Sequence, residues 1–320
     1  MAQMDRQDMR VAVLAGGRSS EREISLASGA NAAAALEAAG FGTVELLDTA
    51  ADSFVARITG EAWDAAFLAL HGAGGEDGVI QGFLTFLGIP FTGSGVCASA
   101  VASDKELAKL AYVRAGIPVA AGVALTASDE VDGEAIRAVV GEECFVKPAE
   151  NGSSYGISLV KAASELTGAI EEAFRYGSKV LIEERLVGTE VTVGVFGDDD
   201  LRALPVVEVC CENEGAEFYD LRVKYIDPEK IHRIPARLDE DSYARVQELA
   251  CAAHRALGCH GISRSDFIVT ERGPVILETN TIPGMTDSSL YPDEIAHTDD
   301  LVFSEVCAAL VEMGIARAQK

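Results

Sequence analysis

The chain has 320 residues, of which 48% are hydrophobic and 24% charged, and its formal net charge is -25. This length exceeds what one hydrophobic core usually organises, so we expect two or three packed units, and the composition excludes a disordered or fibrous chain. The negative surface field opposes binding to phosphate backbones and anionic lipids, so we expect neither a nucleic-acid nor a membrane partner.

The number and spacing of the cysteines, together with the N-terminal residues, indicate the cellular compartment of the protein. The sequence has seven cysteines, an odd number, with no CxxC pair or zinc-ligand spacing, so buried free thiols are expected. The apolar run at 11–15 is too short for an export signal, and no later run approaches the ~18 apolar residues that span a bilayer. A cytoplasmic protein is therefore expected.

The start of the chain alternates apolar runs with a helical segment. The apolar runs lie at 10–15, 43–47 and 65–70. A helix is expected between the first two, with Ser20 and Glu23 at capping-box spacing and Gly40 as its C-terminal stop. This βαβ pattern predicts a parallel sheet, and we assign residues 1–98 to an N-terminal Rossmann-like domain.

A second unit is expected over residues 99–185. The sequence Ser103-Asp104-Lys105 can cap a helix that runs to Arg114, before a Gly-Ile-Pro sequence ends it. The later elements expected here are a strand at 144–149, a Gly/Ser-rich loop at 150–156, a helix at 164–176 and a strand at 179–184.

The third unit is expected over residues 186–320 and begins with strands. The runs 191–196 and 201–210 flank a GDDD turn and predict a hairpin. The long polar segment 211–237 lacks periodicity, and a loop of this length is more often functional than accidental. The elements expected after it are a helix at 239–257, two strands around Gly273 and a helix from about Asp300.

The segment 144–156, CFVKPAENGSSYG, combines a strand with a phosphate-binding type of turn. Successive backbone N–H groups in a Gly/Ser turn can hold phosphate oxygens, and Lys147 supplies a point charge. The spacing differs from the GxxxxGK[ST] loop, so a P-loop fold is not indicated. Taken alone, this segment is more often an ordinary turn.

The two C-terminal strands end in oxygen ligands. Glu278 and Asn280 are two residues apart and so face one side of a strand, while Asp266 lies on the other strand. This set suits one or two Mg²⁺ ions, although a solvated strand end has the same pattern. Arg264, two residues before Asp266, can point into the same site and stabilise an oxyanion.

Two residues near the start are weaker candidates. His71 directly follows a strand, where the edge of a parallel sheet offers a binding crevice, but an ordinary loop histidine fits the local pattern better. Glu21 lies beside a helix start, where a favourable helix-dipole charge explains it equally well.

Together these segments resemble the D-alanine–D-alanine ligases of the ATP-grasp superfamily. Seven matching segments occur in family order: AGGRSSEREISL (15–26), ALHGAGGEDGVIQG (69–82), PFTGSGVCASAVASDK (90–105), VKPAENGSSYGIS (146–158), FYDLRVKY (218–225), RSDF (264–267) and ETNTIPGMTDSSLYP (278–292). One such motif occurs by chance, but seven in order do not. The resemblance implies an α/β ATP-grasp fold behind the N-terminal domain, with 211–237 as a lid in the C-terminal subdomain.

The resemblance also implies which residues hold the nucleotide. Lys105 and Lys147 resemble the lysines that bind ATP phosphates, and Ser153 lies in the loop that closes over them. Glu183 matches an adenine-contacting position and Glu190 a ribose-contacting one. The metal ligands implied are Asp266, Glu278 and Asn280, which would hold two Mg²⁺ ions that Mn²⁺ could replace.

The substrate positions implied by the resemblance lie on both sides of the reacting carbonyl. Glu21 matches the group that holds the ammonium of the first D-alanine, and His71 lines that pocket. Arg264 and the Gly284 backbone match the oxyanion site. The positions around the carboxylate of the second D-alanine are Lys224, Ser289 and Leu290.

The resemblance also implies residues that take part in closing the loop over the site. Tyr225 resembles the loop tyrosine that hydrogen-bonds toward Ser153 and Glu21. Residue 222 is Arg where an acidic residue is common, and Tyr155 stands where Val is frequent. These departures bear on loop closure and leave the inferred metal ligands unchanged.

The resemblance implies an activity with two alternatives. The first D-alanine carboxylate would attack the γ-phosphate of ATP, and the amine of a second D-alanine would attack the resulting acyl phosphate. A ligase of the same fold with D-lactate or D-serine as second substrate is one alternative, although Lys224 and Tyr225 favour D-alanine. A noncatalytic nucleotide-binding protein is the other. A homodimer is also expected.

Overall fold

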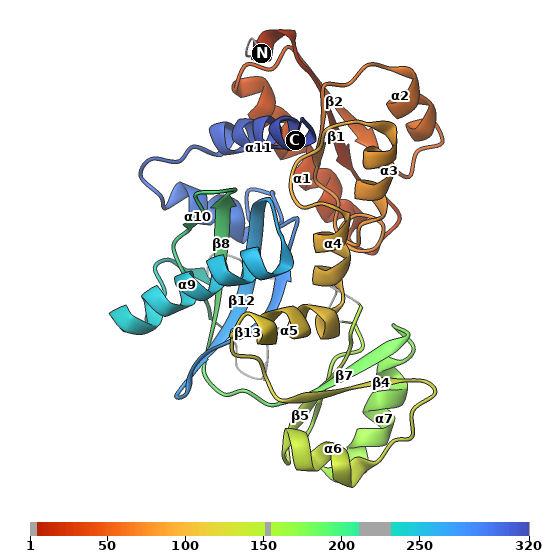
Figure 1. Cartoon of the computed structure of the whole chain (residues 1–320), viewed down its shortest axis with the longest axis vertical. Helices are drawn as coiled ribbons and strands as arrows, with labels where there is room; N and C mark the ends of the chain where they lie inside the picture. The colour runs from red at the N-terminus through yellow and green to blue at the C-terminus, as the bar shows by residue number, and fades with distance from the viewer. Residues whose placement is uncertain (1–4, 151–154, 211–231, 320) are drawn as a thin grey trace.

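The computed structural model describes residues 5–150, 155–210 and 232–319, and the structural statements below concern these residues. Three sheets follow one another along the molecule. In Figure 1 the N-terminal sheet lies at the top, the C-terminal sheet in the middle and the central sheet, with β4, β5 and β7, at the bottom. The boundaries at 98 and 185 stay a prediction.

The N-terminal sheet is parallel, as predicted, in the order β2-β1-β3. Its strands are β1 (Arg10–Ala15), β2 (Thr43–Asp48) and β3 (Ala65–Leu68). Its helices are α1 (Arg22–Ala38), α2 (Phe54–Gly60) and α3 (Val79–Leu87), after a short 3-10 turn η1 (Arg6–Asp8). Strand β1 is almost wholly buried because helices cover both faces of the sheet. Gly40, with φ +92°, follows the end of α1, as predicted.

The start of α1 differs from the prediction. The prediction of a capping box formed by Ser20 and Glu23 is wrong, because the residue at the cap position is Glu21, which makes no side-chain capping hydrogen bond. The hydroxyl of Ser19 donates to the carbonyl of His71 at 2.7 Å. This turn is therefore organised by the loop after β3, a tertiary contact that local spacing does not reveal.

The central sheet is antiparallel in the order β4-β7-β5-β6. Its strands are β4 (Gly122–Thr126), β5 (Cys144–Pro148), β6 (Ser158–Val160) and β7 (Lys179–Glu184). Helices α6 (Gly133–Val140) and α7 (Ala163–Ala173) pack on it and share one apolar core with it. Burial alternates along β5, so that Cys144 and Val146 face this core while Phe145 and Lys147, on the other face, are half-buried.

The C-terminal sheet has the order β11-β10-β8-β12-β13, with β9 paired to β8. Its strands are β8 (Thr189–Gly197), β9 (Arg202–Ala203), β10 (Val207–Val209), β11 (His232–Arg233), β12 (Gly261–Thr270) and β13 (Gly273–Asn280). Helices α4 (Val96–Ser103), α5 (Lys105–Arg114) and α9 (Glu240–Leu257) supply its second layer. The predicted cap at Ser103-Asp104-Lys105 is confirmed, and the capping residue is Asp104, whose carboxylate accepts from the amides of Glu106 and Leu107.

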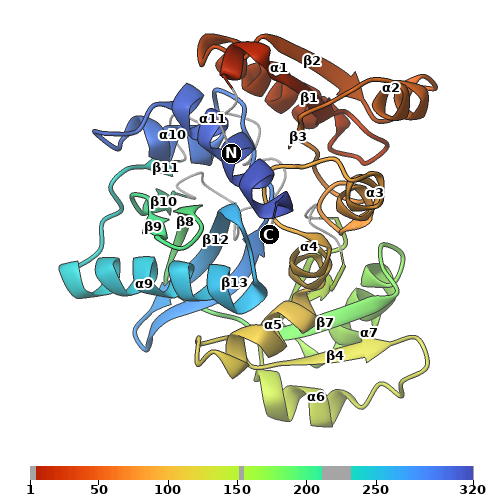
Figure 2. The same ribbon diagram turned by 45° about the horizontal axis from the view of Figure 1, so that its top comes forward.

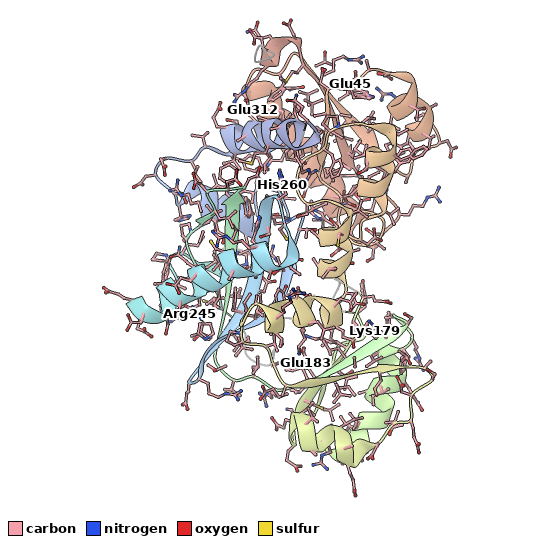
Figure 3. The ribbon with its side chains drawn as sticks, in the orientation of Figure 1. Glu45, Lys179, Glu183, Arg245, His260 and Glu312 are labelled. Atoms are coloured by element: carbon pink, nitrogen blue, oxygen red, sulfur yellow. The ribbon has the colours of Figure 1, made fainter. Side chains whose placement is uncertain are left out.

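The last helices return to the N-terminal sheet. They are α10 (Leu290–Ala296) and α11 (Phe303–Ala318). Helix α11 lies beside α1 (Figure 2) and shares its apolar core. Arg6 adds ion pairs to Glu305 at 3.0 Å and to Glu312 at 2.9 Å, and Figure 3 labels Glu312 on α11. The two ends of the chain thus build one core.

Two further predictions can be checked on the described residues. The six cysteines described are free thiols, but Cys97 is exposed, so the expectation of burial is wrong there. None of the described helices is long and apolar enough to cross a bilayer.

Candidate active site

A cavity of about 650 Å³ is lined by strand residues of the central and C-terminal sheets and, from the N-terminal unit, by residues of α1 and of the loop after β3. Twelve of the residues singled out from the sequence line it: Glu21, His71, Lys105, Lys147, Glu190, Arg264, Asp266, Glu278, Asn280, Gly284, Ser289 and Leu290. A second hollow of about 610 Å³ lies beside α6 and α7 and contains none of the predicted site residues. The cavity between the sheets is therefore the candidate active site.

His71 is fixed by protein groups on both ring nitrogens. The Ser28 hydroxyl lies 3.1 Å from His71 Nε2, and its oxygen accepts from the Met285 amide, also at 3.1 Å. The ring also hydrogen-bonds the backbone of Ile282. Burial lowers the His71 pKa to about 4. His71 is therefore neutral, and it joins the loop after β3 to the 282–285 segment.

Two carboxylates lie at the N-terminal side of the cavity. A Cβ placed on Gly72, whose φ is +71°, would lie 2.9 Å from Glu21 Oε2, so Glu21 packs against this loop. The Gly72 amide donates to Glu76 Oε2 at 2.7 Å. Glu76 is partly covered as a whole residue, but its carboxylate lies inside the cavity, and burial raises its pKa to about 8. The neighbouring Glu21 charge raises this pKa further.

The predicted oxyanion residues share the opposite wall. Arg264 donates twice to Asp266, at 3.2 Å and 3.3 Å. Burial alone would lower the pKa of Arg264, but the charge and hydrogen bond of Asp266, together with the charges of Glu294 and Glu278, raise it, so the guanidinium stays charged. The Ser289 hydroxyl packs against Gly284, where an added Cβ would lie only 2.7 Å from Oγ. A side chain at Gly284 would thus displace this loop.

The predicted metal ligands meet across two paired strands. Asp266 on β12 stands opposite Glu278 on β13, and the Asn280 amide reaches Asp266 Oδ2 at 3.4 Å. Among the described residues no cluster of three His, Cys, Asp or Glu side chains could hold a metal. Two carboxylates and an amide oxygen nevertheless fit Mg²⁺, which keeps waters and phosphates as its other ligands.

Both predicted phosphate lysines are paired with carboxylates. Lys105 Nζ lies 2.7 Å from Glu278 Oε2, and Lys147 pairs with Glu183. Burial alone would lower the Lys105 pKa, but the charge and hydrogen bond of Glu278, together with the charges of Glu183 and Asp266, raise it, so the amine stays protonated. Glu183 is only 5% exposed and is not part of the cavity lining, in contrast to Glu190.

Three predicted site residues lie outside the described residues: Ser153, Lys224 and Tyr225. Most of the proposed lid, 211–237, lies there too. Its last part is described, and His232 on β11 lines the cavity. The roles assigned to the twelve cavity residues and to Glu183 stay predictions.

Sequence reasoning missed Glu76, Ser28 and Lys109. Glu76 lies in the same Gly-rich segment that drew attention to His71, so the signal was present but only one residue was used. Ser28 is fully buried within α1, and no local pattern separates it from other helical serines. Lys109 is one helical turn after Lys105, a spacing that places both on one face of α5.

Two family models match most of the chain. A family model described as the D-ala D-ala ligase C-terminus matches residues 110–312, and one described as the D-ala D-ala ligase N-terminus matches residues 47–94. This chain belongs to the D-alanine–D-alanine ligase family. The resemblance inferred from the seven segments is confirmed.

Relatives of this family match nearly the whole chain. A D-alanine–D-alanine ligase of Syntrophobacter fumaroxidans is 41% identical over 312 residues, which cover 98% of this chain and 99% of that protein. One from Halalkalibacterium halodurans is 45% identical over 288 residues, covering 89% and 92%. Coverage of this extent includes all three sheets.

Solved ligase structures have the same fold. The D-alanine–D-alanine ligase of Bacillus anthracis matches with a TM-score of 0.84 and 30% identity, covering 97% of this chain and 99% of that one. The same enzyme complexed with ATP matches with a TM-score of 0.81 and 27% identity, covering 97% and 98%. The predicted ATP-grasp fold is confirmed.

Proposed function

We propose that this chain joins two D-alanine molecules to D-alanyl-D-alanine with ATP, releasing ADP and phosphate, for peptidoglycan precursor synthesis. The observation that carries the proposal is the cavity between the sheets of a D-alanine–D-alanine ligase family member, lined by lysines, carboxylates and a buried arginine. This arrangement suits an acyl phosphate route, because it supplies positive charge for phosphates beside groups for an amino acid.

In the proposed first step the carboxylate of the first D-alanine attacks the γ-phosphorus of ATP, giving an acyl phosphate and ADP. Glu21, which lines the cavity beside Glu76, would hold the ammonium of that substrate. Lys105 and Lys147 hold the phosphates. Catalysis in this step comes mainly from positioning, since the cavity aligns the two reactants.

In the proposed second step the amine of the second D-alanine attacks the acyl carbonyl, and phosphate leaves. Arg264 and the Gly284 amide stabilise the oxyanion, and both line the cavity. Ser289 and Leu290, with Lys224, receive the carboxylate of the second substrate. The segment 211–237, with Tyr225 and Ser153, closes the site and keeps water from the acyl phosphate.

Asp266, Glu278 and Asn280 hold divalent cations in this proposal. Mg²⁺ bound there would neutralise charge on the transferred phosphate. The amide of Asn280 and the two carboxylates already lie within one corner of the cavity, and Lys105 supplies a further positive charge beside them.

Phosphate release with ATP, Mg²⁺ and a panel of amino and hydroxy acids tests the function. D-alanine alone should support release, and L-alanine should not. A preference for D-lactate or D-serine beside D-alanine would replace the dipeptide proposal with the related ligase activity. No release with any partner, from protein that binds ATP, would favour a noncatalytic nucleotide-binding protein.

We also propose that the enzyme is a cytoplasmic homodimer that contacts its copy through α3 and α4. Phe86 is 88% exposed, Val79, one heptad before it, is 64% exposed, and Val96 on α4 is 43% exposed. Exposed apolar residues gathered in this way mark an association surface. Light scattering should give twice the chain mass, with Phe86→Glu monomeric and Val302→Glu, exposed elsewhere, still dimeric.

A further inference from the structure

Two lysines share the buried carboxylate of Glu183. Lys109 on α5 pairs with Oε1, and Lys147 on β5 pairs with Oε2. Figure 3 shows Glu183 below α5, at the boundary between the C-terminal and the central units. The carboxylate is 5% exposed, so it needs a positive partner to remain ionised there.

The two lysines differ in what else holds them. Lys109 Nζ also donates to the carbonyl of Ala120 at 2.8 Å, and Ala120 is itself buried in the segment between α5 and β4. Lys147 lines the cavity, whereas Lys109 is not among the lining residues. Lys109 is thus anchored behind the site, and Lys147 faces the space where nucleotide phosphates would lie.

The different positions of the two lysines affect the free energy of nucleotide binding. If Lys147 turns from Glu183 to a phosphate, it leaves a buried carboxylate behind. Without another cation, that carboxylate would be uncompensated in an apolar setting, which is strongly unfavourable. With Lys109 in place, Glu183 keeps a positive partner while Lys147 moves.

We propose that Lys109 is a positioning residue that holds Glu183 neutralised and thereby releases Lys147 for the nucleotide phosphates. The proposal rests on the proposed function, in which Lys147 binds ATP phosphates. It predicts that Lys109 contributes to affinity for the phosphates of a nucleotide, though it would not contact them, and contributes little to affinity for the nucleoside part.

Calorimetric binding of adenosine, ADP and ATP, with Mg²⁺ and without amino acid, separates these contributions. Lys109→Met removes the charge and keeps the chain length. We expect the Kd of this variant for ADP and ATP to be about tenfold or more higher than that of the parent, and its Kd for adenosine to stay within about threefold. The difference is expected because only the phosphates require Lys147 to leave Glu183. Lys109→Arg keeps the charge and should restore most of the affinity for ADP and ATP.

A double substitution tests whether Lys109 acts through the charge of Glu183. If it does, then Lys109→Met should add little to the effect of Glu183→Gln on the affinity for ADP and ATP, because no buried charge is left to compensate. Independent, additive losses would overturn the proposal. Lys161→Met, an exposed lysine of the same unit, should bind all three ligands as the parent does.

Other results of the binding measurements would contradict the role of Lys109 or that of Lys147. Equal weakening of adenosine and ATP in Lys109→Met would mean that Lys109 only shapes the nucleoside pocket, and the proposal would fail. If Lys109→Met does not fold, Lys109→Gln keeps a donor for the Ala120 carbonyl and repeats the test. If the parent itself binds ATP no more tightly than adenosine, it is the phosphate role of Lys147 in the proposed function that fails.

Discussion

Replacing Glu76 by Gln should change how the stability of the protein depends on pH. The carboxylate has an ordinary pKa of 4.5, and burial beside Glu21 and Glu278, despite Arg264 nearby, raises it to about 8 in the folded chain. Between these two values the folded state keeps a proton that the unfolded state has released. Raising the pH therefore favours unfolding, and the stabilising contribution present below 4.5 is lost as the pH passes 8.

The size of this effect follows from the shift. A displacement from 4.5 to about 8 corresponds to about 5 kcal/mol at full titration, since one unit is about 1.4 kcal/mol. The glutamine side chain cannot ionise in either state, so the Glu76→Gln variant lacks this loss. The variant should become more stable relative to the parent as the pH rises from about 5 to about 9, by roughly 2–4 kcal/mol.

Urea unfolding of ligand-free parent and variant at several pH values measures the difference. Near pH 4.5 the Glu76 side chain of the parent is protonated in the folded state, so the two proteins should be closest in stability there. Glu294, another buried carboxylate with a raised pKa, adds the same slope to both and cancels. A difference that stays constant with pH would refute the placement of Glu76 in a desolvated site.

Three other substitutions test the site and its support. Glu278→Gln should lose most turnover while the protein stays folded, and near-normal phosphate release at limiting Mg²⁺ would contradict its role. Ser28→Ala breaks the link between the His71 ring and the Met285 amide, so kcat should fall about tenfold or more, and the melting temperature should fall as well because two buried polar groups lose their partner; unchanged kcat would contradict that link. Gly194→Ala places a Cβ 2.6 Å from Glu294 Oε2, and should lower the free energy of unfolding by about 1–3 kcal/mol, as read from the urea midpoint.

Much of the secondary structure could be predicted because apolar runs and turn residues are local signals. The run KVLIEE predicted strand β7 with its observed bounds, Lys179–Glu184, and Asp104 marked the start of α5. The spacing of Glu278 and Asn280 also placed two oxygen groups on one face of β13. Each of these inferences depends only on neighbours within a few residues.

What could not be predicted depends on distant parts of the chain. The pKa of Glu76 is set by burial and by residues as distant in the sequence as Glu278, so its Gly-rich segment could indicate a place near the site but not the raised pKa. The pairing of Lys109 with Glu183 likewise requires α5 to lie against β7. The failed cap at Ser20 has the same cause, because the loop at His71 organises that turn. Local preference decides an element only where tertiary contacts do not compete.

The packing of α11 against α1 has a consequence for synthesis of the protein on the ribosome. The N-terminal sheet is complete once β3 has been made, yet the core it shares with α11 includes Val306, Leu310 and Val311, near the far end of the chain. At roughly 5–20 residues per second, α11 follows on the order of ten seconds or more after β3. During that interval the apolar face of α1 lacks its cover, so the nascent N-terminal segment should be a client of chaperones that bind exposed apolar helices.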